Sequence, residues 1–353
     1  MSMRGSLQTG PGGAKSGADP QNSGISLVDS PNAEKIVTII GGSGFIGRHL
    51  VRALAKRGYR IRVACRRPDL AGHVQPLGTP GQIMPVQANV RYPASLAAAC
   101  DGATAVINLP GVLASSGAQS FDAIHVFGAE ATARAAKAAG AGVFIQMSAL
   151  GADPDSASEY ARSKATGEAK AKAAFPGAII LRPSIVFGPE DNFFNQFAAL
   201  SRLAPALPLL GGGSTKFAPL FVGDLAEAIA KLVERGEATG KTYELGGPEI
   251  FTFKQLMEFT LETIGRKRLL VPVPWPIARI MGTLFGLLPY APLTADQVEL
   301  LKTDNVVSEA AVREGRDLAR LGITGRSIQG IVPSYLYRYR KAGQFTVPKG
   351  IPE

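Results

Sequence analysis

A tyrosine and a lysine spaced four residues apart have the clearest chemical potential in the chain. Tyr160 and Lys164 belong to EYARSKATGEAKAKAA, a segment that predicts a helix with both side chains on one face. A nearby ammonium would favour the phenolate and lower the tyrosine pKa below its usual value of about 10. Ser148 follows a predicted strand and would hydrogen-bond a substrate carbonyl. The three side chains together predict a carbonyl/alcohol proton relay beside a hydride donor, the alternative being an exposed helical pair without a chemical role.

A glycine-rich turn near the start of the chain is typical of a dinucleotide site. The β-branched run Ile36–Ile40 predicts a buried parallel strand, and a helical pattern follows and ends at Gly58. Gly41, Gly44 and Gly47 stand between them. One glycine would turn sharply, one would admit a pyrophosphate, and one would let helix and strand pack closely. Free N–H groups at the helix start would then face the phosphates, whereas an ordinary glycine-rich turn would not need this strand–turn–helix context.

Two arginines follow the next predicted strand and indicate which nucleotide is bound. The strand Arg60–Cys65 ends at Arg66 and Arg67. An NAD site places an acidic residue about 20 residues beyond the glycines, where it holds the ribose hydroxyls. Arginine instead suits a 2′-phosphate, because its planar guanidinium carries a fixed charge and several donors. The sequence therefore favours NADP(H) over NAD(H), with a solvated pair of loop arginines as the alternative.

Strands and helices alternate through the first half of the chain. Further strands are predicted at 83–89, 103–109 and 143–147, and an alanine-rich helix at 121–139. This alternation predicts an α/β fold, a Rossmann-type doubly wound parallel sheet, with a smaller mixed C-terminal subdomain. The carboxyl ends of its strands should border the cofactor.

The composition divides the chain into four parts. Residues 1–33 are rich in Gly, Ser, Pro, Asn and Asp and predict a disordered tail. Residues 34–190 form the predicted NADP-binding domain. Residues 191–340 form the smaller subdomain, interleaved with the first, and 341–353 a C-terminal tail.

Charge and composition narrow the classes of partner. The chain has 38 Lys and Arg against 28 Asp and Glu, a net charge of +10, which favours anionic partners. No motif supports nucleic acid. Two cysteines, Cys65 and Cys100, form no framework and read as buried thiols of a reducing compartment, and three scattered histidines offer no metal site. No apolar run reaches the roughly 18 residues of a transmembrane helix, and no secretory signal is recognised.

Several motifs together resemble the short-chain dehydrogenase/reductase superfamily, in its extended and atypical branches. They are IIGGSGFIG at 39–47, INLPG at 107–111, Ser148, YARSK at 160–164 and LRPSIVFGPED at 181–191. The resemblance implies catalytic roles for Ser148, Tyr160 and Lys164. It also implies cofactor contacts from Gly41, Ser43, Gly44, Phe45, Ile46, Gly47, Arg66, Arg67, Asn89, Val90, Leu109, Pro110, Gly111, Tyr160, Lys164, Pro183, Ser184, Ile185 and Val186.

The resemblance extends over residues 35–339. Within the superfamily, the chain resembles one atypical branch in particular, the NADP(H)-binding accessory subunit of respiratory complex I. It implies that the cofactor is structural or regulatory, outside the electron path. Other complex I subunits are the implied partners, with anionic lipid at the membrane junction. The implied location is peripheral, on the cytoplasmic or matrix-equivalent side of the energy-transducing membrane. The alternatives are a free NADP-dependent reductase or epimerase and a sensor of the NADP(H) redox state.

Some positions depart from the superfamily pattern. Ile40 replaces a common threonine before the glycines, and His125 stands where many relatives have a relay asparagine. Asn89 stands where many have aspartate, and 205–220 offers only Lys216 to a second diphosphate. Nucleotide binding is therefore a stronger prediction than turnover.

The segment 275–288, WPIARIMGTLFGLL, is strongly apolar with a single charge at Arg279. Two interpretations compete. It forms a helix that covers the cofactor cleft and packs on the small subdomain. Alternatively, it docks on a partner or membrane surface, aided by basic groups at 266–268 and 338–341.

Overall fold

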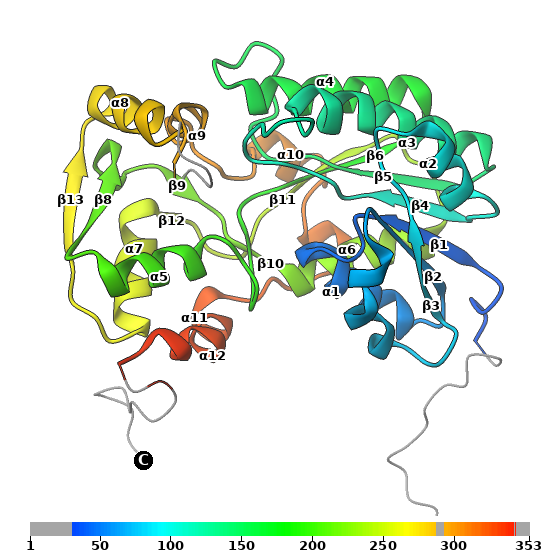
Figure 1. The fold of residues 1–353 in the computed structure, drawn as a ribbon, viewed down its shortest axis with the longest axis horizontal. Coiled ribbons are helices and arrows are strands. Elements are labelled where there is room, and N and C mark those ends of the chain that lie inside the picture. Colours follow the sequence, from blue (N-terminus) through cyan, green and yellow to red (C-terminus); the bar gives the residue numbers. More distant parts are fainter. Residues whose placement is uncertain (1–29, 287–292, 342, 344–353) are drawn as a thin grey trace, which may run out of the picture.

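A seven-stranded parallel sheet forms the larger part of the computed structural model, which describes residues 30–286, 293–341 and 343 (Figure 1). Its spatial order is β3-β2-β1-β4-β5-β6-β11. The strands are β1 (Ile36–Ile40), β2 (Arg60–Cys65), β3 (Ile83–Gln87), β4 (Ala105–Asn108), β5 (Val143–Met147), β6 (Ile179–Pro183) and β11 (Thr242–Leu245). The order reverses between β1 and β4, which is where such sheets bind ligands. The predicted Rossmann-type fold is thereby confirmed.

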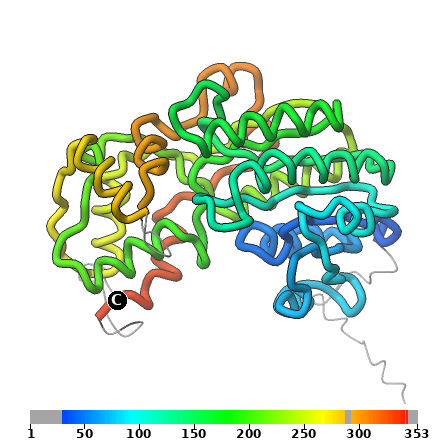
Figure 2. The backbone as a smooth tube through the Cα atoms, turned by 45° about the horizontal axis from the view of Figure 1, so that its top comes forward, coloured from blue at the N-terminus to red at the C-terminus, as the bar shows by residue number. Residues whose placement is uncertain are grey.

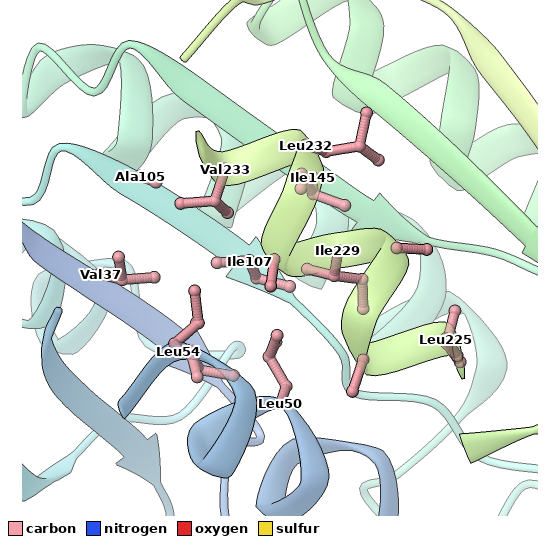
Figure 3. Packing of buried hydrophobic residues seen from close by; sticks show 14 of the residues in the cluster. Val37, Leu50, Leu54, Ala105, Ile107, Ile145, Leu225, Ile229, Leu232 and Val233 are labelled. Atoms are coloured by element: carbon pink, nitrogen blue, oxygen red, sulfur yellow. The ribbon is translucent and has the colours of Figure 1, made fainter. Parts of the chain in front are cut away.

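Helices cover both faces of the sheet. On one face α1 (Phe45–Ala55) and α6 (Val222–Arg235) pack together over the strands, with Leu50, Leu54 and Ile229 fully buried (Figure 3). On the other face lie α2 (Pro93–Cys100), α3 (Gly128–Ala138) and α4 (Glu159–Ala174). Each strand supplies alternate residues to the two layers, because successive side chains point to opposite faces of a sheet. Cys65 and Cys100 are both buried free thiols, as predicted.

The predicted helix at 121–139 begins with a wider turn. Residues Asp122–Phe127 form the π-helical turn η4, and the α-helix α3 continues from Gly128. Pattern analysis predicted one regular helix, because a π turn leaves no mark on apolar periodicity. The wider turn lies against α4 at a point where α4 has no side chain. A Cβ at Gly167 would stand only 2.0 Å from the carbonyl oxygen of His125.

The smaller subdomain lies beside the sheet (Figures 1 and 2). Its core is rich in aromatic residues. Phe187, Phe194 and Phe253 are all buried in it, and the rings of Phe187 and Phe194 meet edge-on. Its elements include α5 (Phe194–Leu203), β8 (Ala206–Leu210), β9 (Lys216–Phe217), β12 (Phe251–Thr252), α7 (Phe253–Thr263), β13 (Leu269–Val273), α8 (Trp275–Gly286) and α9 (Ala295–Leu300). The pair β13-β8 and the pair of β10 (Leu220–Phe221) with β7 (Val186–Phe187) are parallel, whereas β12-β9 is antiparallel, so this part is mixed as predicted.

The chain passes between the two parts several times. After β7 (Val186–Phe187) and β10 (Leu220–Phe221), it returns to the sheet as α6 and β11. It returns again through α10 (Glu309–Arg313), where the backbone N–H of Glu244 in β11 donates to the carbonyl of Arg316. The helices α11 (Ile328–Ile331) and α12 (Pro333–Leu336) then pack in the small subdomain.

The predicted tails 1–33 and 341–353 lie largely outside the described residues, which leave out 1–29, 342 and 344–353. Residues 30–33 belong to the folded part. Ser30 is buried, and the Asn32 amide donates to the carbonyl of Arg57 at 2.9 Å.

Candidate functional site

The glycine turn presents unpaired backbone donors at the carboxyl end of β1. Gly41 has φ +78°, a conformation that favours glycine, and a Cβ at Gly47 would lie 2.5 Å from the carbonyl oxygen of Gly42. Gly44 is exposed and begins α1 without a side-chain cap. Among the described residues, the N–H groups of Ser43, Phe45, Ile46 and Gly47 find no internal acceptor. The helix dipole adds to these donors, so the turn suits a phosphate.

The two arginines after β2 have different environments. Both are exposed, but the Arg67 guanidinium pairs with the Asp69 carboxylate at 2.8 Å. Arg66 has no such partner among the described residues. At the end of β3, Asn89 accepts a hydrogen bond from the backbone N–H of Arg91, and Val90 is buried against Gly128. Arg66 is thus the arginine whose guanidinium is not already paired with a carboxylate and can bind a phosphate.

The end of β4 connects the glycine turn to the predicted catalytic helix. The Pro110 ring lies 3.3 Å from where a Cβ of Gly41 would stand. A Cβ at Gly111 would lie 3.3 Å from Lys164 Nζ and 3.7 Å from His125 Nε2. The chain segment from Leu109 to Gly111 therefore lies between the phosphate turn and Lys164, as the position of a nicotinamide ribose would require.

His125 joins three elements through a chain of hydrogen bonds. The backbone N–H of Val112 donates to its Nε2 at 3.0 Å, so Nδ1 carries the proton. Nδ1 lies 2.9 Å from Ser163 Oγ, which in turn donates to the carbonyl of Tyr160 at 2.7 Å. Burial, and then the charge of Lys164, lower the pKa of His125 to about 3. His125 is therefore neutral and holds the end of β4 against α4.

Tyr160 and Lys164 lie on one face of α4, as the spacing predicted. The Lys164 ammonium is 5.7 Å from the centre of the Tyr160 ring, which also contacts Phe121 and His125 edge-on. The predicted lowering of the tyrosine pKa is wrong. Burial, and then the carboxylate of Asp296, raise the pKa of Tyr160 to about 12. Burial also lowers the pKa of Lys164 to about 8, so a larger fraction of this side chain is neutral near pH 7 than the sequence suggested.

The Ser148 hydroxyl is hydrogen-bonded to the Glu168–Arg182 ion pair. It donates to Glu168 Oε1 at 2.5 Å, and Arg182 donates to both oxygens of Glu168 at 2.8 and 2.7 Å. Glu168 stands one helical turn beyond Lys164, which is the only sequence signal for this network. The Ser148 hydroxyl thus holds β5 to α4 instead of pointing to a substrate.

The predicted nicotinamide border is partly occupied by a structural contact. Ser184 is buried, and its hydroxyl lies 2.9 Å from the carbonyl and 2.7 Å from the side-chain oxygen of Asn305. Pro183 is buried as the last residue of β6, whereas Ile185 and Val186 are half-buried. Within residues 30–286 and 293–341, no group of three or more His, Cys, Asp or Glu has a geometry that could hold a metal ion.

Fold and site define a class, the Rossmann-type proteins with a glycine-rich dinucleotide turn. Residues 37–246 match the model of the NAD dependent epimerase/dehydratase family. The chain belongs to this family, which confirms the resemblance to the extended short-chain dehydrogenases.

Two curated relatives and one solved structure show the range of similar proteins. The first is "NADH dehydrogenase [ubiquinone] 1 alpha subcomplex subunit 9, mitochondrial" of Arabidopsis thaliana, 36% identical over 90% of this chain and 82% of the relative. A ceramide reductase of Caulobacter vibrioides is 35% identical over 80% of this chain and 90% of the relative. An NADPH-dependent quinone oxidoreductase of Escherichia coli, solved with NADPH, superposes with a TM-score of 0.66 at 21% identity, covering 85% of this chain and 99% of that one. Family and fold support a nicotinamide nucleotide as cofactor.

Proposed function

We propose that this protein is an NADP(H)-binding accessory subunit of respiratory complex I, in which the nucleotide serves a structural or regulatory purpose. The similarity to the Arabidopsis complex I subunit over most of both chains supports this assignment. The observation that carries it is the contrast within the site. The phosphate turn offers unpaired donors, whereas the Ser148 hydroxyl is engaged by Glu168. Binding without turnover fits that arrangement.

The residues present fit the nucleotide. The diphosphate would lie on the N–H groups of Ser43 and of residues 45–47, and Arg66 would meet the 2′-phosphate, which favours NADP(H) over NAD(H). Lys164, beside Gly111, would bind the nicotinamide ribose. The segments 89–90 and 183–186 would border the adenine and the nicotinamide. The chain would orient the bound nucleotide, whose capacity to supply a hydride would be used only in the second candidate function below.

The proposed location is peripheral, on the cytoplasmic or matrix-equivalent side of the energy-transducing membrane, against complex I subunits and anionic lipid. In the part of the chain that the structure describes, no helix is long and apolar enough to cross a bilayer. The helix α8 exposes Ile277, Ile280 and Leu284 along one face. Arg279 is exposed on the same helix, about 100° or more around the helix axis from this stripe, and its charge complements acidic headgroups. This supports the docking interpretation of the segment over the covering one.

Native purification tests the proposal. The protein, captured through a chromosomal affinity tag from membranes solubilised in mild detergent, should bring NADH:ubiquinone oxidoreductase subunits with it. Mass spectrometry of the denatured sample should then identify NADP(H) as the released small molecule. Recovery as a free monomer or dimer without respiratory subunits would overturn the accessory role. Release of NAD(H) would overturn the choice of nucleotide alone.

A second candidate is a free NADP-dependent reductase or epimerase. It is favoured by the Tyr160–Lys164 pair and by similarity to the Caulobacter ceramide reductase. With its pKa raised to about 12, Tyr160 would keep its proton at neutral pH and could donate it to a carbonyl oxygen as hydride arrives. A Tyr160→Phe variant should then lose NADPH-dependent turnover of a ceramide-type substrate by at least about a hundredfold while NADPH affinity stays unchanged. Equal turnover in both proteins would reject this candidate.

A further inference from the structure

The carboxylate of Asp296 binds the first turn of α4 from a distant part of the chain. Its Oδ1 accepts from the backbone N–H of Glu159 at 2.6 Å. Its Oδ2 accepts from the Ser158 hydroxyl at 2.9 Å and from the N–H of Tyr160 at 3.2 Å. Asp296 belongs to α9 and is 136 residues from Tyr160. A side chain of the small subdomain therefore binds the backbone of the tyrosine itself.

This contact completes the cap of α4. The first N–H groups of a helix have no acceptor within the helix, and a carboxylate there is also stabilised by the helix dipole. The Ser158 hydroxyl accepts only from the N–H of Ala161. Asp296 supplies the acceptors for Glu159 and Tyr160. Without it, the turn that carries Tyr160 and precedes Lys164 would have two unbound donors.

The helix α8 packs directly on the residues before Asp296. A Cβ at Gly282 of α8 would lie 2.8 Å from the backbone nitrogen of Ala295 and 2.9 Å from the carbonyl of Thr294. Val298 of α9 and Ala278 of α8 are both fully buried in one cluster. Gly282, Asp296 and Tyr160 therefore form a continuous series of contacts from α8 to α4.

We propose that Asp296 is a positioning residue that makes nucleotide binding depend on how the α8–α9 pair is seated against α4. The proposal rests on the proposed function, because it takes Tyr160 and Lys164 as cofactor contacts. A partner that holds α8 in its place would then tighten nucleotide binding, and bound nucleotide would by reciprocity favour that seating of α8.

The first test uses substitutions at Asp296. Fluorescence and calorimetry measure the binding of NADPH to the full chain. Asp296→Ala should raise the NADPH dissociation constant about fivefold, the scale of a lost helix cap. Asp296→Asn keeps one acceptor and should restore most of the affinity. Asp317→Ala is the matched control, since the Asp317 carboxylate accepts a backbone N–H from Arg320 in another helix turn, and it should bind like the wild type.

A double-mutant cycle between α8 and α9 gives the second test. Gly282→Ala should push α8 away from residues 294–295 and weaken NADPH binding, although it lies outside the proposed site. In an Asp296→Ala background it should weaken binding no further, because the connection is already broken. Val298→Ala serves the same purpose if Gly282→Ala does not fold. Melting temperatures are recorded alongside, because a purely structural loss would lower them without moving the dissociation constant.

The outcomes separate the two proposals. If the wild type does not bind NADPH, the proposed function fails. If the wild type binds NADPH and Asp296→Ala binds it equally well, the positioning role of Asp296 is overturned. Losses at positions 282 and 296 that multiply independently would overturn the connection through α8.

Discussion

The two ends of the proposed nucleotide site differ in how many of their polar groups are already bonded. At the phosphate end, the N–H groups of Ser43 and of residues 45–47 and the guanidinium of Arg66 have no partner within the described structure. At the nicotinamide end, Ser148, His125 and Ser184 are hydrogen-bonded to other parts of the protein. The phosphate end offers unbonded donors to a ligand, whereas the polar groups of the nicotinamide end mostly hold neighbouring elements together.

The difference shows that a site can keep the positions of its Tyr and Lys side chains while the neighbouring polar groups bond to the protein and not to a substrate. The Tyr160–Lys164 pair occupies the place that the spacing predicted. The groups around it bind α4 to β4, β5 and α9. A protein that binds nucleotide without transforming it needs donors at the phosphate end and rigidity at the other.

The largest effect is expected at Gly167, in the packed end. A Cβ there would overlap the carbonyl oxygen of His125, which is backbone and has little room to move. Gly167→Ala should lower the free energy of unfolding by about 3 kcal/mol, measured by denaturant titration. Gly72→Ala is the control, since nothing lies within 4 Å of its added methyl group. Equal stability of the two variants would contradict the close packing of α4 on η4.

A smaller effect is expected from pH, through His125. Its folded-state pKa of about 3 lies below the usual 6.5, so the unfolded chain takes up the proton first as pH falls. The stability due to neutral His125 is therefore full above pH 6.5 and is lost at about 1.4 kcal/mol per pH unit below it. Between pH 6.5 and 5 the loss should reach about 2 kcal/mol.

The variant His125→Asn isolates this contribution. It should be less stable than the wild type at pH 7.5, yet its stability should decline less steeply between pH 6.5 and 5. Chemical unfolding at matched pH values measures both slopes. Parallel slopes in the two proteins would mean that His125 does not stay neutral in the fold.

The smallest effect is expected at the open end, in the choice of nucleotide. Arg66→Asp should weaken NADP binding about tenfold more than NAD binding, because it removes an unpaired charge and adds a repulsive one. Arg67→Asp should shift the preference less, since Arg67 is already paired with Asp69. Calorimetric titration with both nucleotides measures the ratio. An equal loss for NADP and NAD at position 66 would remove Arg66 from the 2′-phosphate site.

The sequence predicted the sheet better than the surroundings of the site. The strands β1, β2 and β5 begin and end where expected, because dense β-branched or apolar runs are bounded by glycine and polar residues. The strand β3 ends two residues earlier than predicted, and β4 starts two residues later and ends one earlier, although the N–H groups of Ala88 and Leu109 still donate to the neighbouring strands. The glycine turn and the spacing of Tyr160 and Lys164 were recognisable because both are local patterns.

The partners of the site residues were not recognisable, because they come from distant parts of the chain. Glu168 meets Arg182 and Ser148 only when α4, β5 and β6 are assembled. The sign of the Tyr160 pKa shift depends on burial and on Asp296, neither of which the four-residue spacing reveals. Spacing along a helix gives proximity, whereas electrostatics require the whole fold.

The return of the chain to its first sheet bears on the order in which the protein emerges from the ribosome. The edge strand β11 and the covering helix α6 lie at residues 242–245 and 222–235. Until these have been translated, the apolar side chains of α1 and the central strands have lost only part of their contact with water. The nascent polypeptide is therefore open to chaperones during most of its synthesis, and a fragment ending near residue 190 would lack one wall of its own core.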